Sequence, residues 1–366
     1  AQLGCLWLAL SAESMTHVAA AQVGTLAAAG FLIANNCRRS PDLEAAELGT
    51  DDEQLDDGSA RVFIAGAISI VCLLLATALM FALTGTLELT QIQSVLRNSY
   101  RPDHADMIVG DASRLGVAAI VLLFAATGLQ FSLPPFQVTL SNVFENCPAG
   151  VASFIAIVQR LHAAAVIWKL GVLTLVGFES TVQIVALVCA AAAAVIGTAT
   201  VCRTESLRGL AGGLWTTSAS LLFLALAIGV TSPLRQLAGE QWQLPDGIET
   251  AGLIVTVSSL ALLALLACEW CASIPERRID FHEDLAGLGR QRPLIAVPIA
   301  AAFLTFSAIP PLPGFWAFGF LVASAFIPGL TDRALVPNSA ILLAVTVVGV
   351  SLLIVNTRLV RLFSRI

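Results

Sequence analysis

Two apolar stretches of this sequence are each interrupted by a pair of prolines. The first interruption reads Ser-Leu-Pro-Pro-Phe at 132–136, and the second reads Ala-Ile-Pro-Pro-Leu-Pro-Gly-Phe at 308–315. A proline inside a helix removes a backbone hydrogen bond and clashes with the preceding turn, so each helix must break there. In lipid, broken backbone is tolerated only where it is buried in protein or lines a polar cavity. Two breaks at corresponding places in two halves of a chain therefore indicate an ion path near the middle of a membrane.

The composition agrees with a membrane protein. The chain of 366 residues is 57% hydrophobic and 12% charged, which is about half the charged fraction of an average soluble domain. Its net charge is −6, and no basic cluster is interleaved with aromatic residues, which argues against nucleic-acid binding. We therefore expect an all-α, polytopic transmembrane helix bundle that contacts the lipid bilayer, with residues 1–366 forming a single membrane domain.

The apolar windows predict about nine membrane spans. A span needs about 20 predominantly apolar residues, and windows of this kind lie at 3–34, 62–84, 113–131, 149–176, 181–202, 209–231, 250–272, 294–328 and 338–360. The third and eighth contain the proline breaks. The first window is longer than one crossing requires, so we expect a tilt or a break near 11–17.

Basic residues predict the orientation. If the loop after the first span is cytoplasmic, twelve arginines lie on the cytoplasmic side and five on the opposite side, as expected from the excess of basic residues in cytoplasmic loops. Residues 41–59 are acidic and lack apolar periodicity, which predicts a solvated cytoplasmic loop. Residues 87–100 have apolar residues at helical spacing, which predicts an amphipathic helix along the membrane interface.

Four ionisable residues fall inside or beside apolar segments, where a charge is costly and usually functional. They are Glu13 near the start of the first window, and Arg160, His162 and Lys169 in the fourth. A functional interpretation is a chain of proton-carrying groups, with Arg160 biasing its neighbours. A structural interpretation also stands for each: an interfacial Glu13, a paired Arg160, an interior hydrogen bond at His162, and a Lys169 that extends to the membrane surface.

Lys169 is the only lysine in the chain, against eighteen arginines. The distinction is chemical. A buried lysine can release its proton when it is desolvated, whereas a guanidinium stays charged. Arginine can attract or repel ions, but it cannot carry a proton along a relay.

Several ordered segments resemble subunit N of respiratory NADH–quinone oxidoreductase (complex I), an antiporter-like subunit of its membrane arm. The strongest stretch is Phe-Ser-Leu-Pro-Pro-Phe-Gln at 131–137, followed by Val-Phe-Glu-Asn-Cys-Pro-Ala-Gly-Val at 143–151. Further similar segments occur in family order at 84–89, 206–210 and 307–315. The sister antiporter-like subunits have a histidine before the segment around Glu145, which this chain lacks, so subunit N fits better.

The resemblance implies a longer protein and an internal symmetry. The family has fourteen spans, and this chain would begin near the fifth and stop after the thirteenth. Since the chain lacks an initiator Met and is apolar from its first residues, we expect a partial chain, or one whose first helices lie on another polypeptide. The two broken helices would be equivalent members of inverted repeats.

In the first half, the resemblance places three of the family's proton-path residues. The glutamate of the family's fifth helix corresponds to Glu13, although about ten extra residues follow before Arg38. The lysine of the first broken helix corresponds to Gln130, which cannot titrate. The lysine of the next helix corresponds to Arg160, which keeps the charge but exchanges no proton.

In the second half, the resemblance retains even less of the relay. The lysine–arginine pair that opens the family's tenth helix corresponds to Arg208 and Gly209, and the histidine further along corresponds to Ser218. The lysine of the second broken helix corresponds to Phe318. The scaffold is kept while most of the relay chemistry is lost, so we expect this subunit to pump weakly or not at all. The candidate proton-path residues are Glu13, Arg160, His162, Lys169 and Arg208.

The function implied by the resemblance is a membrane-arm subunit of a proton-translocating NADH–quinone oxidoreductase in a bacterial inner membrane. NADH, FMN, iron–sulfur clusters and quinone are expected on partner subunits, because the chain has no glycine-rich phosphate loop and no cysteines at cluster spacing. No metal site is expected. Two alternatives remain open: a subunit of a multi-subunit cation/proton antiporter, and a non-pumping spacer of the complex I membrane arm.

Overall fold

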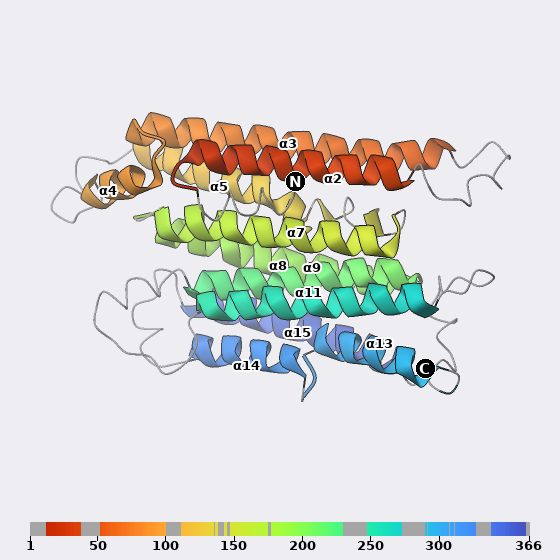
Figure 1. The fold of residues 1–366 in the computed structure, drawn as a ribbon. Helices are drawn as coiled ribbons and strands as arrows, with labels where there is room; N and C mark the ends of the chain where they lie inside the picture. Colours follow the sequence, from red (N-terminus) through yellow and green to blue (C-terminus); the bar gives the residue numbers. More distant parts are fainter. Residues whose placement is uncertain are drawn as a thin grey trace. The chain divides into compact units, whose positions relative to one another are not determined.

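The computed structural model describes most of the chain, with gaps between the helices. The described residues are 12–37, 52–99, 111–134, 136–137, 143–144, 147–174, 177–229, 247–272, 290, 292–306, 308–310, 312–326 and 338–363. Every named element among them is a helix (Figure 1). The elements are α2 (Met15–Cys37), α3 (Asp52–Thr84), α4 (Leu89–Ser99), α5 (Asp111–Phe131), α7 (Ala149–Val166), the π-helix η3 (Ile167–Thr174), α8 (Glu179–Arg203), α9 (Leu207–Gly229), α11 (Gly247–Ala272), α13 (Pro293–Phe306), α14 (Pro313–Phe326) and α15 (Asn338–Phe363).

Seven helices of the described chain are long and apolar enough to cross a membrane. Three shorter apolar helices accompany them: Arg114–Gly128, Pro293–Phe306 and Pro313–Ala323. These shorter helices lie where the proline pairs predict the broken spans. The prediction of an all-α, polytopic bundle with two broken helices is therefore confirmed.

The chain divides into two compact units. The first unit comprises Ala1–Phe131 and Ile155–Val185, and the second comprises Ser132–Phe154 and Ala186–Ile366. In the first unit, α3 packs against both α2 and α5 (Figure 1). In the second unit, α11 packs against α9, α13 and α14, and α15 also contacts α9.

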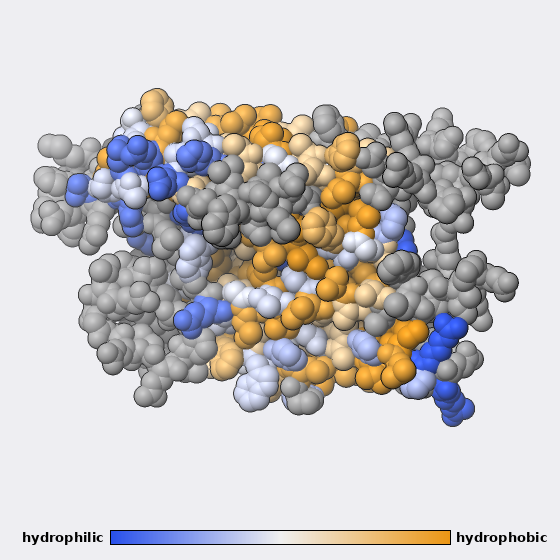
Figure 2. All heavy atoms as spheres, in the orientation of Figure 1, coloured by the Kyte–Doolittle hydropathy of each residue, from blue (hydrophilic) through white to orange (hydrophobic). Residues whose placement is uncertain are grey.

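Large apolar side chains are exposed along the spanning helices. Figure 2 shows hydrophobic surface over the middles of the helices and hydrophilic surface near helix ends, for example around α4. Phe31 is 67% exposed, Val188 is 62% exposed and Leu343 is 65% exposed. Water would disfavour so much exposed apolar area, whereas lipid or an apolar partner subunit accommodates it.

The two broken helices end in the same backbone conformation. The helix before the first break ends at Phe131 and is followed by Ser132 with φ 59°. The helix before the second break ends at Phe306, and Ala308 follows with φ 54°. A residue in this left-handed region commonly terminates a helix, but it is usually glycine because a side chain is disfavoured there. The two breaks share this unusual feature.

The turn that follows is also the same at both breaks. The N–H of Phe136 donates to the carbonyl of Leu133 at 2.6 Å, and the N–H of Leu312 donates to the carbonyl of Ile309 at 3.2 Å. Each bond joins two residues that are three positions apart, with a pair of prolines between them. Both turns begin directly after the residue with positive φ. This local repetition supports the equivalence of the two broken helices.

Three helix boundaries refine the sequence predictions. Helix α2 begins at Met15, inside the region 11–17 where we expect a tilt or a break, while residues 1–11 lie outside the described residues. Helix α4 covers Leu89–Ser99 and buries Leu89, Ile92 and Leu96, as expected of the predicted amphipathic helix. Helix α3 begins at Asp52, so residues 52–59 of the predicted acidic loop 41–59 are helical. Acidic residues are generally favourable near the start of a helix because of its dipole, while 41–51 lie outside the described residues.

Glycines allow two close helix contacts in the second unit. A Cβ on Gly197 of α8 would lie 2.7 Å from the backbone N of Thr217 in α9, and a Cβ on Gly213 of α9 would lie 2.9 Å from the backbone N of Val201 in α8. The contact is reciprocal, with a four-residue spacing on both helices. A glycine on each of two membrane helices lets their backbones approach closely.

Gly314 lets the two halves of the second broken helix lie close to one another. A Cβ at this position would lie 1.8 Å from the carbonyl oxygen of Thr305. On the same helix α14, Gly319 has no atom within 4 Å of an added Cβ.

We predict that Gly314→Ala lowers the stability of the protein by about 1–3 kcal/mol, because the backbone of Thr305 would have to move. Gly319→Ala is the matched control, and we expect it to be neutral or to stabilise the helix by up to about 1 kcal/mol. Thermal unfolding of both variants in detergent measures the difference. Equal midpoints for the two variants would show that the break does not depend on this contact.

Candidate functional site

Two of the predicted site residues lie deeply buried on α7. Arg160 is 1% exposed and His162 is 0% exposed. Both belong to the part of α7 that lies in the first unit. Burial of two such polar groups in an apolar helix bundle is costly unless they find partners. They are therefore the side chains around which a site would be organised.

His162 pairs with a residue of the first broken helix. Its Nδ1 lies 3.3 Å from Oε1 of Gln130 on α5, which is also 0% exposed. The structure thus joins the predicted site residue His162 to the position where the resemblance implies a lysine. The pair consists of an amide and an imidazole. It contains no lysine, whose side chain could alternate between a charged and a neutral form as it passes a proton.

A second buried polar group lies on α2, and the sequence analysis missed it. Nε2 of Gln22 donates to Oγ of Ser69 on α3 at 3.0 Å and to the carbonyl oxygen of Ala126 on α5 at 3.5 Å. The hydroxyl of Ser69 also donates to the carbonyl of Ala126. Gln22 and Ser69 are 0% and 1% exposed. The sequence signal that indicates this site is a glutamine inside an apolar window.

These contacts form one row of neutral polar groups within the first unit. Ala126 and Gln130 are four residues apart on α5, so they lie on the same face of that helix one turn apart. We call Gln22, Ser69, Gln130 and His162 the polar seam. Gln22 of α2 and Ser69 of α3 bond to α5 at the carbonyl of Ala126. His162 of α7 pairs with α5 at Gln130.

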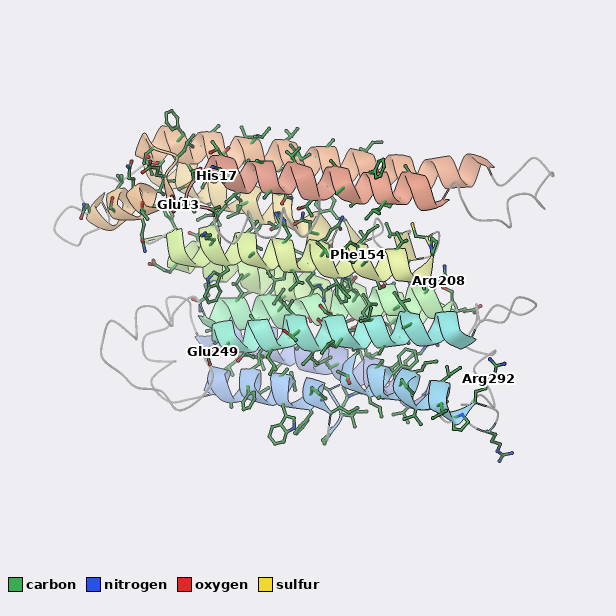
Figure 3. The ribbon with its side chains drawn as sticks, in the orientation of Figure 1. Glu13, His17, Phe154, Arg208, Glu249 and Arg292 are labelled. Carbon is green, nitrogen blue, oxygen red and sulfur yellow. The ribbon has the colours of Figure 1, made fainter. Side chains whose placement is uncertain are left out.

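Glu13 is placed away from the polar seam. It directly precedes the segment that starts α2, and it is exposed. Its carbonyl accepts a hydrogen bond from the N–H of Leu89, and the N–H of Met15 donates to the carbonyl of Leu87, which ties the start of α2 to α4. Figure 3 shows Glu13 together with His17 beside this junction. An exposed position beside a helix start is what the interfacial interpretation of Glu13 expects.

Lys169 lies on η3, the π-helical continuation of α7, and is half-buried. A π-helical turn is rare and is often found at functional sites. Lys169 and His162 belong to one continuous helical segment within the first unit, seven residues apart. Lys169 therefore lies on the same helical segment as one member of the polar seam. Its role in proton transfer stays a prediction.

Arg208 binds backbone carbonyls in the second unit. It is the second residue of α9 (Figure 3). Its Nη1 donates to the carbonyl oxygen of Cys147 at 3.1 Å and to that of Phe144 at 3.5 Å. Those carbonyls belong to the chain between the first break and α7. A charged donor to backbone carbonyls fixes their position more strongly than a neutral donor would, so the observed contacts of Arg208 position the backbone.

Acidic and basic residues in the described helices of the second unit lie only near helix ends. They are Arg203, Arg208, Glu249, Glu269, Arg358 and Arg361. Glu249 lies near the start of α11, and Arg292 lies directly before α13 (Figure 3). Helices α13 and α14 contain neither an acidic nor a basic residue, and Phe318 is half-buried on α14. In the described helices, the second half of the predicted relay therefore has no acidic or basic residue in mid-helix.

The fold and these sites define a polytopic membrane protein with two equivalent broken helices, one of them beside a buried polar seam. Residues 48–331 match the family described as NADH:quinone oxidoreductase/Mrp antiporter, transmembrane. Since this match covers most of the chain, the protein belongs to that family.

Two relatives show the similarity along the sequence. The chain is 22% identical over 287 residues to NADH-quinone oxidoreductase subunit N of Parvibaculum lavamentivorans, covering 78% of this chain and 54% of the relative. It is 23% identical over 288 residues to F(420)H(2) dehydrogenase subunit N of Methanosarcina mazei, covering 78% of this chain and 55% of the relative. The chain thus spans about half the length of these relatives.

Two solved structures share the fold. The similarity to a chain of the membrane-bound sulfane sulfur reductase, an archaeal respiratory membrane complex, has a TM-score of 0.73 at 13% identity, covering 100% of this chain and 64% of that chain. The similarity to a chain of the Mrp complex from Dietzia sp. DQ12-45-1b has a TM-score of 0.71 at 16% identity, covering 100% of this chain and 59% of that chain. At these identities the likeness establishes the fold.

We predict that Arg208→Met lowers the stability by about 1–3 kcal/mol, because two backbone carbonyls lose a charged donor. Arg203→Met is the control, since Arg203 is exposed at the end of α8 and surface changes of this kind usually stay within about 0.5 kcal/mol. Thermal unfolding in detergent gives both values. A loss that is no greater for Arg208→Met than for the control would contradict the positioning role.

Proposed function

We propose that this chain is a membrane-arm subunit of a proton-translocating NADH–quinone oxidoreductase, in the position that subunit N takes. The observation that carries the proposal is the pair of equivalent breaks, at Ser132 and Ala308, in a chain whose family includes such subunits. The complex would lie in a bacterial inner membrane. Its NADH, FMN, iron–sulfur and quinone sites would belong to partner subunits, and this chain would contact neighbouring membrane-arm subunits through its exposed apolar surface.

Within that complex, we infer that this subunit itself moves few protons or none. A relay of this kind needs groups that alternate between charged and neutral forms. The first break carries Gln130 in the polar seam, the second carries Phe318, and the described helices of the second unit have no acidic or basic residue in mid-helix. The subunit would then contribute mainly to assembly and sealing of the membrane arm.

A second candidate function is a subunit of a multi-subunit cation/proton antiporter. The fold similarity to a chain of the Mrp complex favours it. The two candidates differ in their partners, because an antiporter complex lacks NADH oxidation. Both require the same scaffold, so the fold does not discriminate between them.

Affinity purification of this chain from its native membranes tests the assignment. We expect it to co-purify with quinone-dependent NADH oxidation, since the redox sites would reside on subunits bound to it. The same purification from cells without the affinity tag is the control. A stable multi-subunit complex that lacks NADH oxidation would instead establish the antiporter candidate, and recovery of the chain alone would contradict both.

Proton stoichiometry tests whether the relay is lost. We expect Glu13→Gln to leave the number of protons moved per NADH unchanged, because Glu13 is exposed at the start of α2 and a spacer does not depend on its titration. Proton uptake by inverted membrane vesicles, at matched rates of NADH oxidation, gives the number. A reduced stoichiometry would show that the chain pumps.

The complementary variant restores charge at both breaks. Gln130→Lys combined with Phe318→Lys should raise the stoichiometry in an assembled complex, if these two positions limit transfer. Each single substitution serves as a control, because one lysine leaves the other half of the relay interrupted. An unchanged stoichiometry in the assembled double variant would count against ordinary relay chemistry in this subunit.

A further inference from the structure

The two equivalent breaks differ in how far the chain itself covers them. At the first break, Ser132 is 1% exposed and Leu133 is 4% exposed. At the second break, Ala308 and Ile309 are half-buried and Pro310 is exposed. In Figure 1 the segment that joins α13 to α14 extends away from α11, the helix that packs against both. The backbone of the second break is therefore open at the surface of the described chain.

The second break also lies deep in the membrane. Helix α13 has 14 residues and begins directly after the exposed Arg292, a charged residue of the kind found at membrane surfaces. At 1.5 Å per residue, α13 extends about 21 Å from that surface, which is near the middle of a bilayer of about 40–45 Å including its headgroups. At that depth lipid cannot satisfy an open backbone group.

The local turn of the second break leaves two backbone acceptors. The N–H of Leu312 donates to the carbonyl of Ile309, and the N–H of Ala308 donates to the carbonyl of Thr305. The three prolines between 310 and 313 have no N–H to donate. Within the described residues, no hydrogen bond reaches the carbonyl oxygens of Ala308 and Pro310. These two carbonyls therefore require a donor from outside the described chain.

Trp316 of α14 adds a donor close to the break. Its side chain is 57% exposed, and its ring lies against those of Phe315 and Phe320. In the part of the chain that the structure describes, its indole N–H makes no hydrogen bond. Tryptophan is enriched at membrane surfaces, where this N–H reaches water or headgroups, whereas Trp316 lies only three residues after Pro313 of the break. The second break thus presents acceptors and a donor together.

This combination identifies the class of partner. Acyl chains can neither donate nor accept, whereas the side chains of serine, threonine, asparagine and glutamine do both. In a membrane, such side chains are carried by transmembrane helices and form hydrogen bonds between helices. The surface also has room for a helix: Gly319 of α14 is half-buried, and an added Cβ there would have no atom within 4 Å.

We propose that the second break is a docking surface for a transmembrane helix of a partner subunit, which carries serine, threonine, asparagine or glutamine at the level of the break. These side chains donate to the carbonyls of Ala308 and Pro310 and accept from the indole of Trp316. Apolar residues of the same helix fill the space beside Gly319. The inference rests on the proposed function and deepens it, since it names the surface that receives a neighbouring subunit.

Site-specific photo-crosslinking of the full chain in its native membranes tests the proposal. Trp316 is replaced by the photoreactive residue p-benzoylphenylalanine, and the products of irradiation are mapped by mass spectrometry. We expect an adduct with a membrane-spanning segment of another polypeptide that contains serine, threonine, asparagine or glutamine. Val195 is the matched control, because it is 56% exposed in the same unit but belongs to the unbroken helix α8. The same replacement there should give mainly lipid adducts.

Several crosslinking results would overturn the proposal. Adducts of position 316 with lipid alone would show that no subunit covers the break. Adducts within the chain, or with a second copy of it, would show a different occupant. A partner segment without any of the four polar residues would refute the hydrogen-bonding basis. Equal yields of protein adducts from positions 316 and 195 would show that the break does not select the partner.

Gly319→Leu tests the same surface without a crosslinker. The added side chain enters the space proposed for the partner helix, so we expect about tenfold weaker co-purification of the crosslinked partner. Gly349→Leu on α15 is the matched control, since Gly349 is also half-buried with no atom within 4 Å of an added Cβ. Both variants should keep the unfolding midpoint of the unsubstituted protein in detergent. Equal co-purification by the two folded variants would contradict docking at α14, and the crosslinking result decides alone if Gly319→Leu unfolds early.

The failure of this inference differs from the failure of the proposed function. Co-purifying NADH oxidation, together with adducts of position 316 to lipid alone, would refute the docking surface and leave the function standing. A partner helix crosslinked at position 316, in a complex without NADH oxidation, would refute the function and leave the docking surface standing.

Discussion

Hydrogen bonding of the backbone at the two proline breaks is the constraint on which the rest of this fold depends. A broken helix inside a membrane exposes N–H and C=O groups that lipid cannot satisfy. Both breaks meet part of this requirement in the same way, with a left-handed residue at Ser132 or Ala308 and a short hydrogen-bonded turn over the prolines. Arg208 and Gly314 extend the arrangement, the first by binding carbonyls of the segment that follows one break, the second by admitting the carbonyl of Thr305 at the other.

Backbone geometry and side-chain chemistry have separate requirements in this protein. The breaks keep their backbone conformation although Gln130 precedes one and Phe318 follows the other. Replacing a titratable side chain removes a proton carrier but leaves the local turn intact. Replacing a glycine such as Gly314 would disturb the backbone itself. A family scaffold can therefore persist where the ion path lacks proton carriers, and this is the physical basis of the proposal that the subunit seals and connects a membrane arm.

The sequence predicted features that depend on local chemistry. Hydropathy located the spanning helices, and the prolines located both breaks, because each signal lies within the segment that it predicts. The left-handed residues were not predicted, since serine and alanine are poor indicators of positive φ. The buried role of Gln22 also escaped prediction, because it depends on Ser69 and Ala126 from other helices. The helical start of α3 at Asp52 lies within a stretch whose acidity and lack of apolar periodicity predicted a loop.

The position of Gln22 also bears on how a relay can be lost without loss of the fold. The resemblance assigned the family's glutamate to Glu13 only by admitting about ten extra residues before Arg38, and Gln22 lies nine residues further along. With Gln22 on α2 and Gln130 on α5, both buried positions carry neutral amides. Removing one partner of a buried ion pair leaves an uncompensated charge and costs about 3–5 kcal/mol. Neutralising both positions avoids that cost. The two neutral amides of Gln22 and Gln130 are therefore compatible with a stable helix bundle that carries no charge at these positions.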